Sequence, residues 1–144
     1  MESTILIADG DSELIELYQC YLTRFGYRVL AASGGVECLS IIHYESPDII
    51  VASLDMPWGG AAGLVDYLDE ESRQSWVPSV ILTGCMADEN VAELREVPCV
   101  FRYLRKPFLL GRLLDCIRSL ESNGCVKAGL GHEFPLPQFA DCCD

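Results

Sequence analysis

The sequence has few basic residues, with ten Lys and Arg against 22 Asp and Glu, and its formal net charge is −12 over 144 residues. Such a surface repels phosphate backbones, so we expect no direct nucleic-acid binding. Long hydrophobic runs are also missing, since no stretch approaches the ~20 apolar residues that a membrane-spanning helix needs. The opening MESTILIADGD has no basic stretch before an apolar one. This argues against a signal peptide and predicts a cytoplasmic protein.

Metal-ligand patterns are scarce, although cysteine is not, because eight Cys stand beside only two His. There is no Cys-x-x-Cys pair, and neither histidine stands at ligand spacing from a cysteine, so no zinc site is predicted. Four cysteines within apolar periodic segments are expected to be small core residues of a protein in a reducing compartment: Cys20, Cys38, Cys99 and Cys116. The vicinal Cys142-Cys143 pair is interpreted as an incidental exposed pair, with a redox-active pair or a soft-metal ligand as the alternatives.

Enzyme signatures are missing too. There is no Gly/Ser/Thr-rich phosphate loop after the first apolar run, no GxSxG, and no base paired with a nucleophile. These absences disfavour a flavodoxin-like or hydrolytic enzyme. We therefore expect a protein that is not an enzyme.

Half of the residues are hydrophobic, which suits one packed domain. Five short apolar runs alternate with five segments of helical periodicity. The expected strands are 4–8, 27–32, 48–53, 79–84 and 99–104. The expected helices lie between Asp11 and Gly26, near 35–45, 62–72 and 87–95, and from Leu109 to Leu120. Strands that are apolar on both faces and separated by helices predict a parallel sheet covered on each side, a three-layer αβα doubly wound fold.

Two helices have an expected inward face. The first is expected to bury Leu14, Leu17, Tyr18, Tyr21, Leu22 and Phe25, and the second Val36, Leu39 and Ile42. After residue 121 the periodicity ends and Gly and Pro become frequent. We expect a domain over 1–121 and an irregular tail or truncated linker over 122–144, of which Phe134, Leu136 and Phe139 could pack back on the domain.

Polar residues follow four of the five expected strands. In doubly wound folds the functional crevice lies beyond the carboxyl ends of the strands. The residues there are Asp9 and Asp11, Ser53 and Asp55, Thr83, and Lys106 with Pro107. Acids that hold a metal, a lysine that neutralises oxygens and a hydroxyl donor suit a phosphorylated side chain.

On the segments ILIADGDSEL, FGYRVLAASGG, PDIIVASLDMP, PSVILTG and YLRKPF, the chain resembles the CheY-like receiver domain of bacterial two-component response regulators. The resemblance covers residues 4–121 and implies a flavodoxin-like sheet of order 2-1-3-4-5. It also implies roles at five positions. Asp9 matches the first of two adjacent acids, Thr83 the switch hydroxyl and Lys106 the lysine. Pro107 matches a proline that usually follows a cis peptide, and Tyr103 the aromatic residue that turns inward on activation.

Two positions depart from the family pattern. Gly10 stands where the second acid binds the metal. The phosphoacceptor aspartate should stand six residues after Pro47 and four before Pro57, and both counts lead to Ser53. Asp55 matches the position two residues further on, which offers its backbone carbonyl to the metal. Asp55 would be the acceptor only if the third strand were two residues longer.

An acyl phosphate needs a carboxylate nucleophile, and serine supplies only a hydroxyl that stays protonated at neutral pH. Asp9 and Asp11, even with Asp55, make a poor magnesium site, so no cofactor is expected. The sequence therefore predicts a pseudo-receiver that acts by binding, with Lys106, Asp9, Ser53 and Thr83 in one static hydrogen-bonded network. The alternative is a phosphorylatable receiver that uses Asp55 or Asp11 with Mg²⁺.

The partners expected are a histidine kinase or an output protein. Family members usually dimerise or meet partners on the face of the fourth helix, fifth strand and fifth helix. Here that face carries Arg102, Arg105, Tyr103 and Arg112, and its basic residues stand out on an acidic chain. Trp58 in the glycine-rich loop is interpreted as a partner anchor or as a lid on the site. A further reading is that the chain is one domain of a longer regulator.

Overall fold

The computed structural model describes residues 3–57 and 60–124, and it contains five strands that alternate with helices. The strands are β1 (Thr4–Ala8), β2 (Arg28–Ala32), β3 (Ile49–Ser53), β4 (Ser79–Gly84) and β5 (Val100–Arg105). The helices are α1 (Ser12–Thr23), α2 (Gly35–Glu45), α3 (Gly60–Glu71), the 3₁₀ turn η1 (Asp88–Val91), α4 (Ala92–Arg95) and α5 (Leu110–Ser122). None of the helices in these two ranges is long and apolar enough to cross a bilayer.

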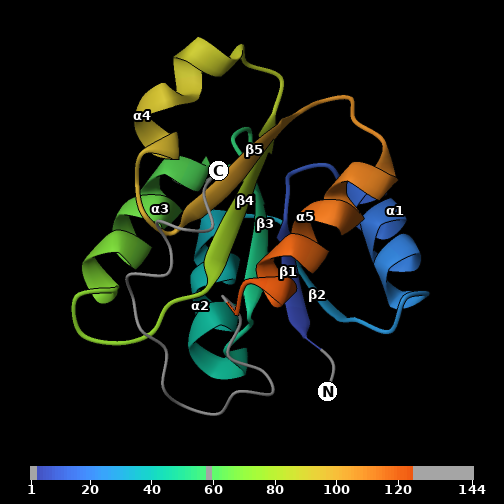
Figure 1. Cartoon of the computed structure of the whole chain (residues 1–144), viewed down its shortest axis with the longest axis horizontal. Coiled ribbons are helices and arrows are strands. Elements are labelled where there is room, and N and C mark those ends of the chain that lie inside the picture. The colour runs from blue at the N-terminus through green and yellow to red at the C-terminus, as the bar shows by residue number, and fades with distance from the viewer. Residues whose placement is uncertain (1–2, 58–59, 125–144) are drawn as a thin grey trace.

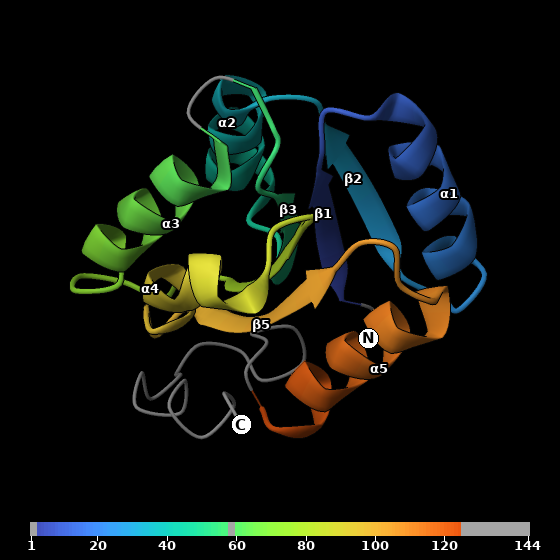
Figure 2. The same cartoon turned by 90° about the horizontal axis from the view of Figure 1, so that it is seen from above.

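The strands form one parallel sheet in the order β2-β1-β3-β4-β5, with α1 and α5 on one face and α2, α3 and α4 on the other (Figure 1, Figure 2). Successive residues of a strand point to opposite faces, so each strand contributes to two cores. Leu6, Ile50 and Leu82 pack beneath α2 and α3, whereas Ile7 and Val51 pack beneath α1 and α5. The prediction of a three-layer doubly wound fold with this strand order is confirmed.

The ends of the first helix follow from local chemistry. Asp11 is the N-cap residue of α1, and its Oδ1 accepts hydrogen bonds from the backbone N–H groups of Glu13 at 3.0 Å and Leu14 at 3.3 Å. After α1, Gly26 adopts a φ of +93°, a left-handed conformation that glycine tolerates. Local residues therefore determine both ends of α1, with Asp11 at its start and Gly26 in the turn that follows it.

Two expected helix faces are correct only in part: Tyr18 and Leu22 are buried and Leu14, Tyr21 and Ile42 pack against the core, but four other residues, Leu17, Phe25, Val36 and Leu39, are exposed. On α1 the buried residues are Ile15, Tyr18 and Leu22, so Leu17 is exposed and Cys20 is a free exposed thiol instead of a core residue. On α2 the buried side chain is Cys38, while Val36 is 72 % exposed and Leu39 is exposed as well. A side chain one or two residues along a helix from a buried position is turned away from that face, whatever its hydrophobicity, whereas residues three or four apart share a face.

The remaining differences concern element ends. The helix expected over 87–95 is a 3₁₀ turn followed by a single α-helical turn, and Leu109 precedes α5 and is exposed. β5 begins and ends one residue later than expected. Trp58, Cys142-Cys143 and the apolar residues Phe134, Leu136 and Phe139 lie outside the described residues.

Candidate functional site

Four adjacent strand ends place their polar residues on one rim. Parallel pairing aligns Ala8 with Ala52 and Ser53 with Thr83, and it aligns Gly84 with Arg105. Ser53 ends β3, Thr83 is the last residue but one of β4, and Asp9 and Lys106 directly follow β1 and β5. The sheet therefore brings together the four positions that the sequence singles out.

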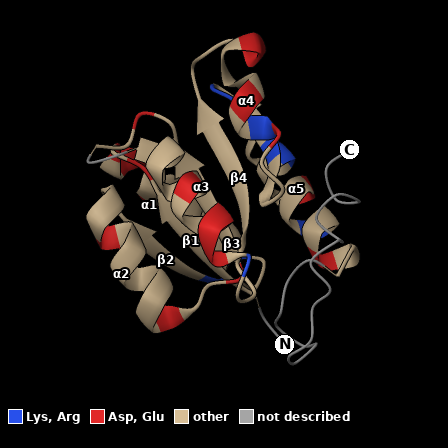
Figure 3. Ribbon diagram, turned by 90° about the vertical axis from the view of Figure 1, so that its left-hand side faces the viewer, with Lys and Arg blue, Asp and Glu red and all other residues tan. Residues whose placement is uncertain are grey.

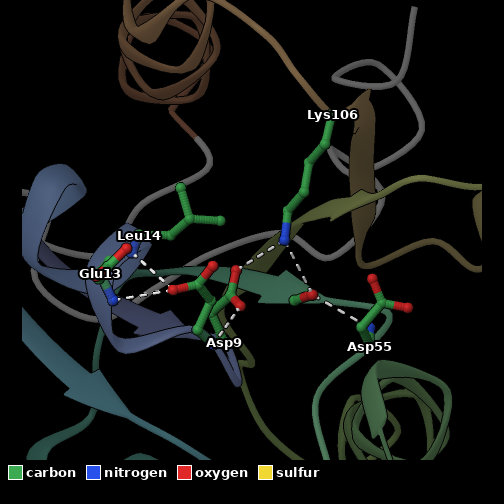
Figure 4. A network of polar contacts seen from close by, with 7 residues as sticks. Asp9, Glu13, Leu14, Asp55 and Lys106 are labelled. Atoms are coloured by element: carbon green, nitrogen blue, oxygen red, sulfur yellow. Dashed lines mark hydrogen bonds and ion pairs between the residues drawn. The ribbon is translucent and has the colours of Figure 1, made fainter.

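Lys106 is the cation of this rim (Figure 4). Its Nζ lies 3.0 Å from Asp9 Oδ2 and donates a second hydrogen bond to Ser53 Oγ at 3.4 Å. The ion pair is largely buried, with side chains that are 15 % and 4 % exposed for Lys106 and Asp9. A charge at this depth needs a partner, because desolvation of an unpaired ion costs several kcal/mol. The pair therefore fixes the lysine over the end of the sheet.

Asp9 is held from two sides. Its Oδ2 accepts from Lys106, and its Oδ1 accepts a hydrogen bond from the backbone N–H of Asp11 at 2.9 Å. The same acids influence Tyr18 on α1, because burial first, and then the charges of Asp9 and Asp11, raise the pKa of its phenol to about 12. Both carboxylate oxygens of Asp9 are thus engaged within the chain.

Ser53 is the last residue of β3 and is fully buried, at 0 % exposure. Its Oγ accepts hydrogen bonds from Lys106 Nζ and from the backbone N–H of Asp55 at 3.1 Å. Asp55 lies in the turn after the strand and is exposed, and no hydrogen bond or ion pair joins its carboxylate to the Lys106 ammonium (Figure 4). The longer third strand that would bring Asp55 to the strand end is not present.

Thr83 lies next to Ser53 in the sheet but does not join the network. Its side chain is buried at 1 % exposure, and its Oγ1 has no hydrogen-bond partner among residues 3–57 and 60–124. The expected network of four residues is therefore wrong in this member. The network consists of Lys106, Asp9 and Ser53, whose Oγ also accepts from the Asp55 backbone. A buried hydroxyl without a hydrogen-bond partner costs about 1–3 kcal/mol, and Thr83 carries this cost in the present arrangement.

Tyr103 and Pro107 occupy the β5 side of the rim. The Tyr103 hydroxyl donates a hydrogen bond to the backbone carbonyl of Met86 at 2.6 Å, which ties β5 to the loop after β4. Burial raises the pKa of this phenol. Tyr103 as a whole is only 8 % exposed. The Lys106-Pro107 peptide is cis, as the resemblance implies.

One contact of this rim was not anticipated from the sequence. Leu54, directly after Ser53, donates its N–H to the Thr83 carbonyl at 2.8 Å. A Cβ built on Gly84 would lie 3.0 Å from Leu54 Cδ1, so the Leu54 side chain fills the space that a side chain at residue 84 would need. In the sequence, Gly84 after Thr83 indicates that another group comes close to the backbone there, but it does not identify that group as Leu54. Leu54 covers the β4 end of the rim.

The basic face expected beside β5 and α5 exists. Arg105 and Arg112 line one hollow there with Tyr103, and Arg102 and Arg112 line a second with Asp115. Arg102 lies over the ring of its neighbour Phe101 at 5.0 Å. Lys and Arg appear beside α4 and α5, whereas α2 and α3 carry Asp and Glu (Figure 3). Dimerisation through this face remains a prediction.

Comparison with known proteins gives a consistent result. Residues 5–118 match the family model described as the response regulator receiver domain. The chain is 27 % identical over 117 residues to the transcriptional regulatory protein GltR of Pseudomonas aeruginosa, covering 81 % of this chain and 48 % of that protein. It is 32 % identical over 119 residues to the probable transcriptional regulator ycf27 of Cyanophora paradoxa, covering 81 % and 47 %. The chain thus spans about half the length of these curated relatives.

Solved structures share the fold. The receiver domain of the Francisella response regulator 1452 superposes with a TM-score of 0.77 at 23 % identity, over 85 % of this chain and 99 % of that one. A receiver domain protein from Clostridium thermocellum gives 0.74 at 24 % identity, over 85 % and 96 %. At this identity the superpositions establish the architecture alone.

Proposed function

The chain belongs to the response regulator receiver domain family of two-component systems, and we propose that within this family it is a pseudo-receiver, which binds partner proteins without accepting a phosphoryl group. The partners expected are a histidine kinase or an output protein. No enzymatic turnover and no contact with nucleic acid are expected of this domain.

The observation that carries the proposal is the place of Ser53. It ends β3 on the rim, it is fully buried, and its Oγ accepts hydrogen bonds from Lys106 and from the Asp55 backbone. A carboxylate is needed there to attack phosphorus and form an acyl phosphate. The Lys106 ammonium that contacts the hydroxyl is paired with Asp9 and donates to Ser53, so it does not act as a base. Ser53 is therefore a structural acceptor of hydrogen bonds.

The donor set does not fit Mg²⁺, which requires nearly octahedral oxygen ligands. Both oxygens of Asp9 are engaged, and Asp11 caps α1 through its Oδ1. Gly10 offers no side chain. Within the described residues, no three Asp, Glu, His or Cys side chains gather into a metal-holding group. We therefore assign no step to a metal ion.

The phosphorylatable alternative is disfavoured by the same geometry. Asp11 is committed to the helix cap, and Asp55 is exposed in a turn, while the contacts of the Lys106 ammonium go to Asp9 and Ser53. A nucleophile must be held beside the groups that neutralise the phosphoryl oxygens. Neither carboxylate meets this requirement.

The test is a titration with beryllofluoride and Mg²⁺, which together mimic a phosphorylated aspartate. We expect the backbone amide signals of Thr83 and Tyr103 to stay in place in nuclear magnetic resonance spectra, because no carboxylate is available to hold the mimic. A receiver that retains its acceptor aspartate, titrated in parallel, is the positive control. Tight binding with shifts at the two residues would refute the proposal.

A further inference from the structure

A groove between α2 and α3 lies apart from the rim that holds Ser53. Pro47 and Pro78, which precede β3 and β4, form part of its wall, so it opens at the opposite end of these strands. The groove has a volume of about 180 Å³. Its rings come from His43, Tyr67 and Trp76. Whatever occupies it is separate from the chemistry of the rim.

The groove has an aromatic surface that is open to a partner. Tyr67 on α3 is 41 % exposed, and Tyr44, the chain neighbour of the groove residue His43 on α2, is 78 % exposed. Tyr44 meets His43 edge to face, with ring centroids 4.9 Å apart. Rigid aromatic side chains supply contact area at low entropic cost, and they are common anchors of protein interfaces.

The two helices that flank the groove are acidic, although Glu45 on α2 is already paired with Arg28 of β2 at 2.9 Å. α2 carries two acids, Glu37 and Glu45, and α3 carries four, while neither helix has a Lys or Arg (Figure 3). Three of the α3 acids, Asp69, Glu70 and Glu71, stand in its last turn, where the helix dipole already concentrates negative charge. Glu71 lines the groove itself, and the nearest cation along the chain is the exposed Arg73 in the following turn.

We propose that this α2–α3 groove is a docking site for a basic segment of a partner protein, with an arginine side chain entering between the aromatic rings and pairing with Glu71. A guanidinium group stacks on aromatic faces and forms bidentate contacts with carboxylates, so it matches both features of the groove. A second copy of the chain is a poorer occupant, since two molecules of net charge −12 repel each other. The surface is distinct from the basic face of β5 and α5.

The test titrates the ¹⁵N-labelled chain with a short peptide that carries arginine, beside the same peptide with uncharged citrulline in its place. The arginine peptide is expected to shift the signals of His43, Tyr67 and Trp76, and raised salt should weaken the effect. Glu71→Lys should weaken binding about tenfold, because it removes the carboxylate that pairs with the arginine. A cation suits the dipole at this end of α3, so the substitution should not destabilise the helix. Tyr67→Ala should also weaken it, without any change of charge.

The matched control is Glu93→Lys, which makes the same charge change on exposed α4 and should leave binding within about twofold. Equal weakening by both lysine variants, equal binding of the citrulline peptide, shifts spread over all acidic surfaces, or no binding would overturn the proposal. So would concentration-dependent self-association that Glu71→Lys abolishes, since the occupant would then be a second copy. No phosphodonor is involved, so the result is independent of whether the rim accepts a phosphoryl group.

Discussion

The combined variant Ser53→Asp and Gly10→Asp is expected to become phosphorylated by acetyl phosphate in the presence of Mg²⁺. The carboxylate at residue 53 would attack phosphorus, acetate would leave, and an acyl phosphate would form on the chain. A side chain at residue 53 already lies within reach of Lys106 Nζ, which stands 3.4 Å from the present hydroxyl. The change should be from no labelling to near-stoichiometric labelling, read as intact mass.

The second acid is tolerated by the backbone. Gly10 does not have a left-handed φ, and a Cβ there would lie 3.2 Å from Pro57 Cδ, so the proline ring must move by a few tenths of an ångström. The control joins Gly10→Asp with Ser53→Asn, which keeps the shape but not the nucleophile, and it should stay unlabelled. Phosphorylation of that control on Asp55 or Asp11 would favour the phosphorylatable alternative. A folded double variant that remains unlabelled would contradict our assignment of residue 53.

Lys106→Met is expected to lower the free energy of unfolding by about 3 kcal/mol, the lower end of the cost of breaking a buried ion pair. It would leave the carboxylate of Asp9, whose side chain is 4 % exposed, without its cation. The hydrogen bond from the Asp11 N–H remains and limits the loss. Adding Asp9→Asn to Lys106→Met should recover much of it, because no buried charge is then unpaired. Chemical denaturation measures each variant.

An exposed pair in the same chain supplies the matched control. Arg28 and Glu45 are 2.9 Å apart, but their side chains are 46 % and 44 % exposed. Arg28→Met should therefore cost only about 0–1 kcal/mol, as is usual for surface ion pairs. Equal losses for Lys106→Met and Arg28→Met would show that the Lys106–Asp9 pair does not stabilise the rim more than an exposed pair would.

The sheet and the rim could be predicted because the strands are apolar on both faces and punctuated by prolines. Pro47 and Pro57 place Ser53 at the end of the third strand by counting alone, and β3 does end there. Parallel strands end on the same side of a sheet, so the positions at Asp9, Ser53 and Lys106 had to be neighbours. Asp9 and Lys106 then pair, because two buried charges of opposite sign lie next to each other.

Other features depend on packing that a single sequence does not encode. Val36 is exposed because α2 turns Cys38 toward the sheet, and hydrophobicity alone does not set that rotation. Thr83 Oγ1 is left without a partner although Ser53 lies beside it in the sheet, and side-chain orientation of this kind is set by packing and not by a motif. The α2–α3 groove is formed by residues from separate parts of the chain, so no local sequence motif predicts it.

The central claim is that this receiver-shaped domain lacks a phosphoacceptor, and the most direct measurement is the intact mass of the unaltered chain after treatment with acetyl phosphate and Mg²⁺. We predict no added phosphoryl group, because Ser53 occupies the end of β3 and Asp55 and Asp11 are not held beside Lys106. A mass gain of one phosphoryl group, localised to Asp55 or Asp11, would contradict the account.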